Sequence, residues 1–223
     1  MLSEKNAVLL VSGVPADRRG QSRALHASGG NLGAYWFTKK HNRWFKTAEQ
    51  ASFAWTGFFG DVGYVRSLLL AGGKTVISVE NGSCWQGQCG QWLTLFELED
   101  GRVRSILDDD FLMIHSDSIF ATEVCEELLK APSPTTMEAN EDEYSTVVGC
   151  YDITGKWSIE PIGNFPNDLV VQYSGKRTHH EHIANDAPLH YRLTTKNVDT
   201  TLVMRYINGR YTRILGVNPA PPI

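Results

Sequence analysis

Three histidines and a glutamate stand side by side in the sequence, as His179-His180-Glu181-His182. Imidazole and carboxylate groups gathered in this way could hold zinc or nickel. On a strand, however, His180 and His182 would face one way and Glu181 the other, and the His-Glu-x-x-His pattern of zinc enzymes is absent. The neighbouring residues are polar, so we predict a solvated loop here, with no metal and no cofactor.

Carboxylates are concentrated at Asp108, Asp109 and Asp110, and His115 and Asp117 follow closely. Such a run could bind calcium or a basic protein partner, but the glycine and terminal glutamate of an EF-hand loop are missing. A carboxylate beside His115 could also serve acid–base catalysis. No G-x-S-x-G motif and no phosphate-binding loop accompany these residues. We therefore predict that Asp108 to Asp110 form a solvated turn that contacts a protein partner, and that the chain is not an enzyme.

The four cysteines fall into two local pairs, Cys84 with Cys89 and Cys125 with Cys150. An even number of cysteines in local pairs is typical of two disulfides, and four free thiols are the alternative. A zinc site fits less well, because Cys125 and Cys150 have no second ligand beside them. Disulfides persist in oxidising compartments, so we expect a periplasmic or secreted protein.

Aromatic side chains stand on two segments that the sequence marks as loops. Trp85 lies between Cys84 and Cys89, and Phe58 and Phe59 lie in a segment bounded by glycines. Exposed aromatic residues on a loop fixed by a disulfide suit the recognition of a protein or a sugar, although the same residues could equally pack in the core. We predict that all three aromatic residues contact a partner.

Composition limits the classes of function. The 223 residues are 42% hydrophobic, which is ordinary for a globular domain, and the net charge of −4 gives no reason to expect a nucleic-acid partner. No apolar run reaches eighteen residues, so we expect no transmembrane helix. Glu4 precedes the first short apolar run, which is not the pattern of a signal peptide. For an exported protein, we therefore expect that a leader has already been removed.

The elements that position these residues are mostly strands. A helix is predicted over residues 118–130, capped by Asp117 or Ser118 and ended by Pro132. The acidic, proline-containing stretch that follows is the best candidate for a boundary. Strands are indicated by β-branched and aromatic runs in residues 33–47, 75–82, 92–107, 147–159, 168–175 and 200–215.

Four turn pairs share one form, in which a basic residue and then an apolar or aromatic residue follow the turn: His41-Asn42, Asp100-Gly101, Thr154-Gly155 and Asn208-Gly209. The order hairpin, strand, hairpin therefore occurs twice. We predict a mainly β fold of antiparallel sheets in two pseudo-repeated halves, arranged as a sandwich or a propeller-like array, with one short helix between them.

The predicted boundaries follow from the same pattern. Residues 1–131 form a first β unit with the helix at its end, residues 132–146 form an acidic connector, and residues 147–223 form a second β unit. We expect the two units to make one compact domain, because a single unit buries only one face of a small sheet.

Several segments carry a resemblance to known proteins: G-N-L-G-A-Y-W-F, F-x-W-T-G-F-F-G, S-C-W-Q-G-Q-C, D-L-V-V and the ending G-V-N-P. The chain resembles exported proteins of Gram-negative bacteria, some of which are immunity proteins that block toxins of the type VI secretion system in the periplasm. The resemblance implies a periplasmic inhibitor with a protein partner, and it assigns no functional residue.

The expected function is therefore that of a non-enzymatic periplasmic binding protein, with an immunity protein as its specific form. One alternative is a cell-envelope hydrolase acting on glycan or peptide through His115 and a carboxylate. Another is a sugar- or ligand-binding module centred on Trp85.

Overall fold

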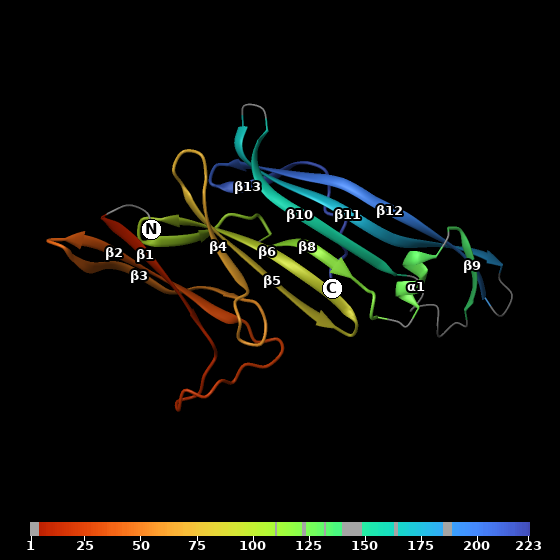
Figure 1. Ribbon diagram of the computed structural model, residues 1–223, viewed down its shortest axis with the longest axis horizontal. Helices are drawn as coiled ribbons and strands as arrows, with labels where there is room; N and C mark the ends of the chain where they lie inside the picture. The colour runs from red at the N-terminus through yellow and green to blue at the C-terminus, as the bar shows by residue number, and fades with distance from the viewer. Residues whose placement is uncertain are drawn as a thin grey trace.

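The computed structural model describes residues 5–109, 111–121, 124–131, 133–139, 149–162, 165–184 and 189–223. In this part of the chain, two antiparallel sheets and one short helix make up the regular structure (Figure 1). The arrangement is sandwich-like and mainly β, which confirms the predicted fold class. No helix among these residues is long and apolar enough to cross a membrane.

The smaller sheet contains β1 (Asn6–Gly13), β2 (Gly30–Lys40) and β3 (Arg43–Thr56), in the order β1-β2-β3. His41 and Asn42 join β2 to β3 with φ angles of 48° and 62°. Positive φ at both central residues gives the hairpin turn whose twist matches that of the strands. This turn is where the sequence predicts it.

The larger sheet has ten strands in the order β13-β12-β11-β10-β8-β6-β5-β4, with β7 beside β6 and β9 beside β12. Because β8 pairs with β10, the sheet runs directly from the first predicted unit into the second. Its strands are β4 (Tyr64–Leu69), β5 (Thr75–Trp85), β6 (Gln88–Glu99), β7 (Arg102–Ser105), β8 (Leu112–Asp117), β9 (Thr135–Ala139), β10 (Tyr151–Ile162), β11 (Phe165–Ala184), β12 (Leu189–Ile207) and β13 (Arg210–Leu215).

Side chains that alternate along β5 and β6 enter two different cores. Ile77 and Phe96 pack against the three-stranded sheet, whereas their neighbours Val76 and Leu95 pack on the opposite side. This period of two is expected for strands that are buried on both faces. The core between the two sheets consists of Leu32, Ala34, Trp36, Val62, Ile77, Val79, Phe96 and Val103.

The strand β13, at one edge of the large sheet, contacts the segment that follows β7. The Tyr211 backbone N–H donates to the Ile106 carbonyl at 2.7 Å, and the Arg104 guanidinium donates to the Gly209 carbonyl at 2.7 Å. The second core therefore includes strands from both ends of the sheet. Its members are Leu70, Val76, Leu93, Leu95, Ile106, Leu107, Ile114, Tyr151, Ile153, Leu169, Val171, Tyr173, Leu202, Met204 and Tyr211.

The buried carboxylate of Glu97 adds a further connection between these distant strands. Glu97 is 3% exposed and accepts hydrogen bonds from Lys74, Arg104 and Tyr206. Burial alone would raise the pKa of Glu97, but the hydrogen bonds from Lys74 and Tyr206 outweigh burial and hold that pKa below its ordinary value. Glu97 therefore stays charged, because its partners replace the water that it loses.

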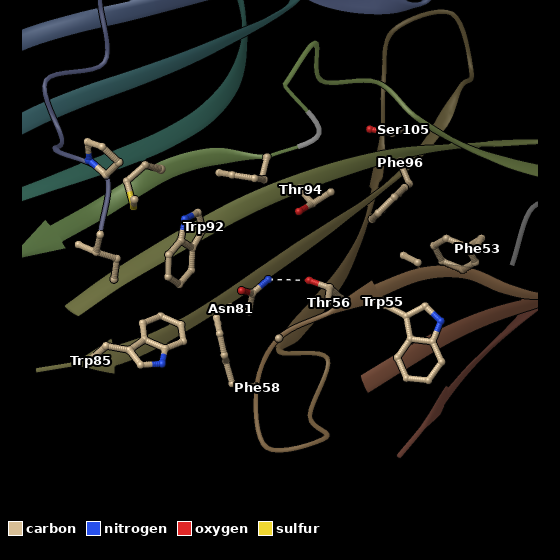
Figure 2. Close-up of a pocket in the computed structure, with 16 residues that line it drawn as sticks. Phe53, Trp55, Thr56, Phe58, Asn81, Trp85, Trp92, Thr94, Phe96 and Ser105 are labelled. Atoms are coloured by element: carbon tan, nitrogen blue, oxygen red, sulfur yellow. Dashed lines mark hydrogen bonds between the residues drawn. The ribbon is translucent and has the colours of Figure 1, made fainter. Parts of the chain in front are cut away.

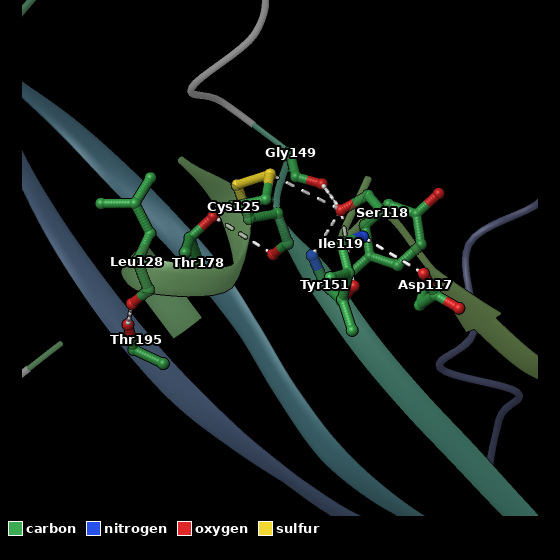
Figure 3. The surroundings of a disulfide bond; sticks show 10 residues. Asp117, Ser118, Ile119, Cys125, Leu128, Gly149, Tyr151, Thr178 and Thr195 are labelled. Carbon is green, nitrogen blue, oxygen red and sulfur yellow. Dashed lines mark hydrogen bonds between the residues drawn. A yellow bond between two sulfur atoms is a disulfide. The ribbon is translucent and has the colours of Figure 1, made fainter. Parts of the chain in front are cut away.

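The helix α1 (Cys125–Lys130) lies against the long hairpin of β11 and β12, at the end of the molecule opposite β1 to β3 (Figure 1). The disulfide between Cys125 and Cys150 fastens it next to β10 (Figure 3). The predicted start at Ser118 is wrong. Ser118 is instead tied to the beginning of β10, because its backbone N–H donates to the Tyr151 carbonyl at 2.9 Å and its hydroxyl accepts from the Tyr151 N–H at 2.9 Å.

The predicted turn at Thr154-Gly155 is also wrong, since both residues lie inside β10. A Cβ atom at Gly155 would stand 2.7 Å from the Tyr173 ring, so this glycine provides room for close packing. The second half therefore lacks its first predicted hairpin, whereas the turns at Asp100-Gly101 and Asn208-Gly209 are present.

Part of the predicted connector is a strand, because β9 pairs with β12. Residues 132 and 140–148 lie outside the described residues. The unit boundaries themselves remain a prediction.

Candidate functional site

An aromatic hollow opens between the three-stranded sheet and the large sheet (Figure 2), with a volume of about 650 Å³. Small-molecule sites are typically 300 to 1,000 Å³, so a ligand of several rings would fit. The residues that line it are Phe53, Ala54, Trp55, Thr56, Gly57, Phe58, Asn81, Trp85, Trp92, Thr94, Phe96, Ser105, Phe111, Met113, Pro222 and Ile223.

Three rings form one wall of the aromatic hollow. The Phe58 ring meets the Trp85 ring edge-on, with 4.8 Å between centroids, and lies 5.5 Å from the Trp92 ring. The two indoles are 6.2 Å apart and are also steeply inclined to each other. Contacts of this kind fix the ring orientations, so the wall is already in place without a ligand.

His26 holds the neighbouring loop in position. Its ring stacks on Phe59 at 4.6 Å and on Trp85 at 5.1 Å, and its Nε2 is 2.8 Å from the Ser83 hydroxyl. Phe59 has a φ angle of 54° and is 65% exposed. A bulky residue rarely adopts this left-handed conformation, which is retained mainly where the surroundings require it.

The local fold around Phe58 depends on glycine. Gly57 has a φ angle of 78°, and a Cβ atom there would stand 1.9 Å from the Asp61 carbonyl oxygen. Only glycine fits this close approach, so the predicted glycine-bounded loop is a tight turn that directs Phe58 into the aromatic hollow.

A disulfide hairpin positions Trp85. Cys84 and Cys89 are paired across β5 and β6 and are joined by a disulfide, which confirms the expected bond. Gln86 and Gly87 form the two-residue turn, with φ angles of 49° and 80°. The strand β5 therefore extends to Trp85, three residues beyond the predicted end at residue 82.

The lining of the aromatic hollow carries no charged side chain among the described residues. Its polar groups are neutral. Asn81 donates from Nδ2 to the Thr56 hydroxyl at 2.8 Å, which leaves its amide oxygen on the side of Trp85 and Trp92 (Figure 2). Within the described chain, the buried hydroxyl of Ser105 has no hydrogen-bond partner.

The last residues of the chain complete the rim. Asn218 donates to the Met113 carbonyl at 2.9 Å, and the Ser116 hydroxyl donates to the Pro221 carbonyl at 2.7 Å. Ile223 then lies over Gly90 and Trp92, since a Cβ atom at Gly90 would stand 2.8 Å from the Ile223 side chain. The tail is thus a fixed wall of the aromatic hollow.

The structure brings together the predicted aromatic contacts and separates the acidic ones. Phe58 and Trp85 line the aromatic hollow, and Phe59 stands beside it. Asp108 and Asp109 are exposed between β7 and β8 and do not line it, although the nearby Phe111 does. Asp110 lies outside the described residues.

Sequence reasoning missed Trp55, Trp92 and His26. Trp92 was predicted to be part of a strand, whereas Trp55 lies outside the predicted strands and His26 lies in a stretch without periodicity. The F-x-W-T-G-F-F-G segment contains Trp55 and is the signal that could have identified it.

The histidine cluster is part of β11, where His179, His180, Glu181 and His182 pair with β12. The predicted loop is therefore wrong, although His179 and Glu181 are exposed. Pairing along β12 explains the strand, because every residue of the cluster has a partner in register. Among the described residues, no three histidine, cysteine or acidic side chains are gathered as for a metal ion.

His115 forms a second polar group. Its Nε2 lies 2.8 Å from the Asp117 carboxylate and its Nδ1 lies 3.0 Å from the Thr154 hydroxyl. With the proton on Nε2, His115 would donate to Asp117 and accept from Thr154. None of these three residues lines the aromatic hollow.

Comparisons with protein-family models, with curated proteins and with solved structures found no match to this chain.

Proposed function

We propose that this protein is a non-enzymatic binding protein of the periplasm or the extracellular space, and that the aromatic hollow is its binding site. The observation that carries the proposal is the convergence of Trp55, Phe58, Trp85 and Trp92 from three separate segments on one cavity. Concave sites lined by aromatic side chains and a few polar groups are typical of ligand binding.

The rigidity of the walls supports binding. A disulfide hairpin holds Trp85, and His26 holds both Phe59 and Trp85. Walls that are fixed before binding reduce the entropy lost on association. The left-handed Phe59 costs about 1–2 kcal/mol, a strain of the kind found at binding sites.

The two disulfides support an oxidising compartment. An immunity protein that blocks a secreted toxin, as the sequence resemblance implies, is one form that this function would take. In that form an apolar side chain of the toxin would enter the aromatic hollow, and exposed Phe59 and Phe111 would contact the surrounding surface.

The proposal is tested with N-phenyl-1-naphthylamine, a neutral dye that fluoresces in apolar sites. We expect the dye to bind the whole chain. The affinity for the dye should fall at least tenfold in Trp92→Ala, since the Trp92 ring is part of one wall of the aromatic hollow. Trp44→Ala is the matched control, because Trp44 is exposed at the β2–β3 hairpin and does not line the hollow.

Trp55→Ala provides a second variant in case Trp92→Ala does not fold, because Trp55 is 64% exposed on the rim. The proposal is overturned if the wild-type chain does not bind the dye. It is also overturned if folded Trp92→Ala and Trp55→Ala bind as tightly as Trp44→Ala.

A hydrolase is the second candidate, and the hydrogen bonds among Asp117, His115 and Thr154 favour it. In the tautomer described above, His115 could accept the hydroxyl proton of Thr154 as that oxygen attacks an ester carbonyl. The test is hydrolysis of p-nitrophenyl acetate, which should be faster for the wild type than for His115→Ala. Equal rates would remove this candidate.

A further inference from the structure

We infer that the aromatic hollow takes a neutral glycan, with sugar rings against its indoles and a sugar hydroxyl bound to Ser105. This inference rests on the proposed function, because it names the ligand of the same site. Three features of the lining carry it, namely the lack of charged side chains among its described residues, its neutral polar side chains and its partly exposed indoles.

The lack of cationic side chains in the lining argues against an anionic ligand. Among the described lining residues, none carries a charged side chain. A phosphate or carboxylate group would lose its hydration without finding a cationic side chain, and an unpaired buried charge is strongly unfavourable. The ligand that suits this lining is therefore neutral.

The polar groups argue against a purely apolar ligand. Among described residues the Ser105 hydroxyl has no hydrogen-bond partner, and its oxygen is buried in the wall. Asn81 donates to Thr56 from its amide nitrogen, and among the described residues its amide oxygen accepts no hydrogen bond. A lipid tail would leave both groups unpaired, whereas a ligand with hydroxyl groups would satisfy them.

The indoles suit the remaining surface of a sugar. A pyranose ring carries hydroxyl groups around its edge and C–H groups on its faces. Those C–H groups bear a small positive charge, and the faces of aromatic rings are negative. Trp55 is 64% exposed, and Trp85 and Trp92 are partly exposed, so indole surface is available in the hollow.

The test is titration calorimetry of the whole protein with neutral hexasaccharides of glucose, galactose, mannose or N-acetylglucosamine. Hexagalacturonate is the charged comparison. We expect at least one neutral hexasaccharide to bind, at least tenfold more tightly than hexagalacturonate, and to displace N-phenyl-1-naphthylamine.

Ser105→Ala tests the proposed hydrogen bond. It should weaken glycan binding about tenfold, the contribution of one hydrogen bond, and should weaken dye binding less. Ser67→Ala is the control, because Ser67 is exposed on β4 and does not line the aromatic hollow.

Each remaining outcome overturns the glycan assignment. One is that no neutral hexasaccharide binds although the dye does, which leaves the proposed function standing. Another is that hexagalacturonate binds as tightly as the neutral sugars. A third is that a protein or peptide displaces the dye while no glycan does. Absence of dye binding would instead remove the proposed function itself.

Discussion

Tyr206 donates a hydrogen bond to the buried carboxylate of Glu97, although 109 residues separate the two in the chain. Glu97 stands on β6 and Tyr206 on β12, so the bond connects strands that are far apart in the order of the large sheet. Lys74 and Arg104 bind the same carboxylate. This group of four side chains connects β12 to β6, to β7 and to the start of β5. The strands β5 and β6 also carry Trp85 and Trp92 of the aromatic hollow.

Glu97→Gln should lower the free energy of unfolding by about 2 kcal/mol, because hydrogen bonds to a charged group contribute about 1.5–3 kcal/mol. Urea unfolding at neutral pH measures the change. Glu49→Gln is the matched control, since its ion pair with Lys46 is exposed and should contribute little. Equal losses in the two variants would contradict the role given to Glu97.

The same carboxylate predicts how stability depends on pH. The pKa of Glu97 lies below its ordinary value of 4.5 in the folded state, so the unfolded chain binds a proton more readily. Its contribution is therefore complete above about pH 4.5 and is lost as the pH falls through the folded pKa. Urea unfolding from pH 7 to pH 3 should show the difference between wild type and Glu97→Gln shrinking only below about pH 4.5. A difference that stays constant to pH 3 would contradict this account.

The two disulfides should differ in their effect on stability. Cys125 and Cys150 are 25 residues apart in the sequence, and Cys84 and Cys89 are five apart. Loop entropy then predicts a loss of about 3.5 kcal/mol on replacing the first pair by serine and about 2 kcal/mol for the second. Replacing the second pair should also weaken dye binding, because that hairpin positions Trp85.

Unfolding curves and dye titrations of the two double variants measure these effects. The intact mass before and after reduction, which should differ by about four hydrogens, verifies the bonds themselves. An unchanged dye affinity in the Cys84→Ser, Cys89→Ser variant would contradict the positioning role of the hairpin.

Gly155→Ala should destabilise the protein by about 1–3 kcal/mol, because the added methyl group would be forced against the Tyr173 ring. Thermal unfolding measures the loss. Gly13→Ala is the control, since Gly13 also lies in a strand but has nothing within 4 Å of an added Cβ atom. Similar effects at the two positions would show that general strand preference, rather than contact with Tyr173, decides the outcome.

Gly155 also shows where sequence reasoning about the fold succeeds and fails. The turns at Asp100-Gly101 and Asn208-Gly209 were predictable, because their chemistry is local. The glycine at position 155 looks the same in sequence, but its reason is contact with Tyr173, which stands on the adjacent strand β11. The pairing of β8 with β10 was equally inaccessible, because strand order depends on contacts between distant segments.

The candidate site was partly predictable for similar reasons. Phe58 and Trp85 were identified because glycines and cysteines mark their loops. Trp92 looks like any aromatic residue of a strand, and its exposure to the hollow depends on where the smaller sheet docks. The unpartnered hydroxyl of Ser105 is likewise a property of packing, which local sequence does not encode.

The central claim, that ligand binds in the aromatic hollow, is tested most directly by the indole N–H signals in a nitrogen-15 NMR titration with N-phenyl-1-naphthylamine. The chain has six tryptophans, of which Trp55, Trp85 and Trp92 line the hollow and Trp36, Trp44 and Trp157 do not. We predict that the first three signals shift on titration and that the other three stay in place. Shifts confined to Trp36, Trp44 or Trp157 would contradict the claim.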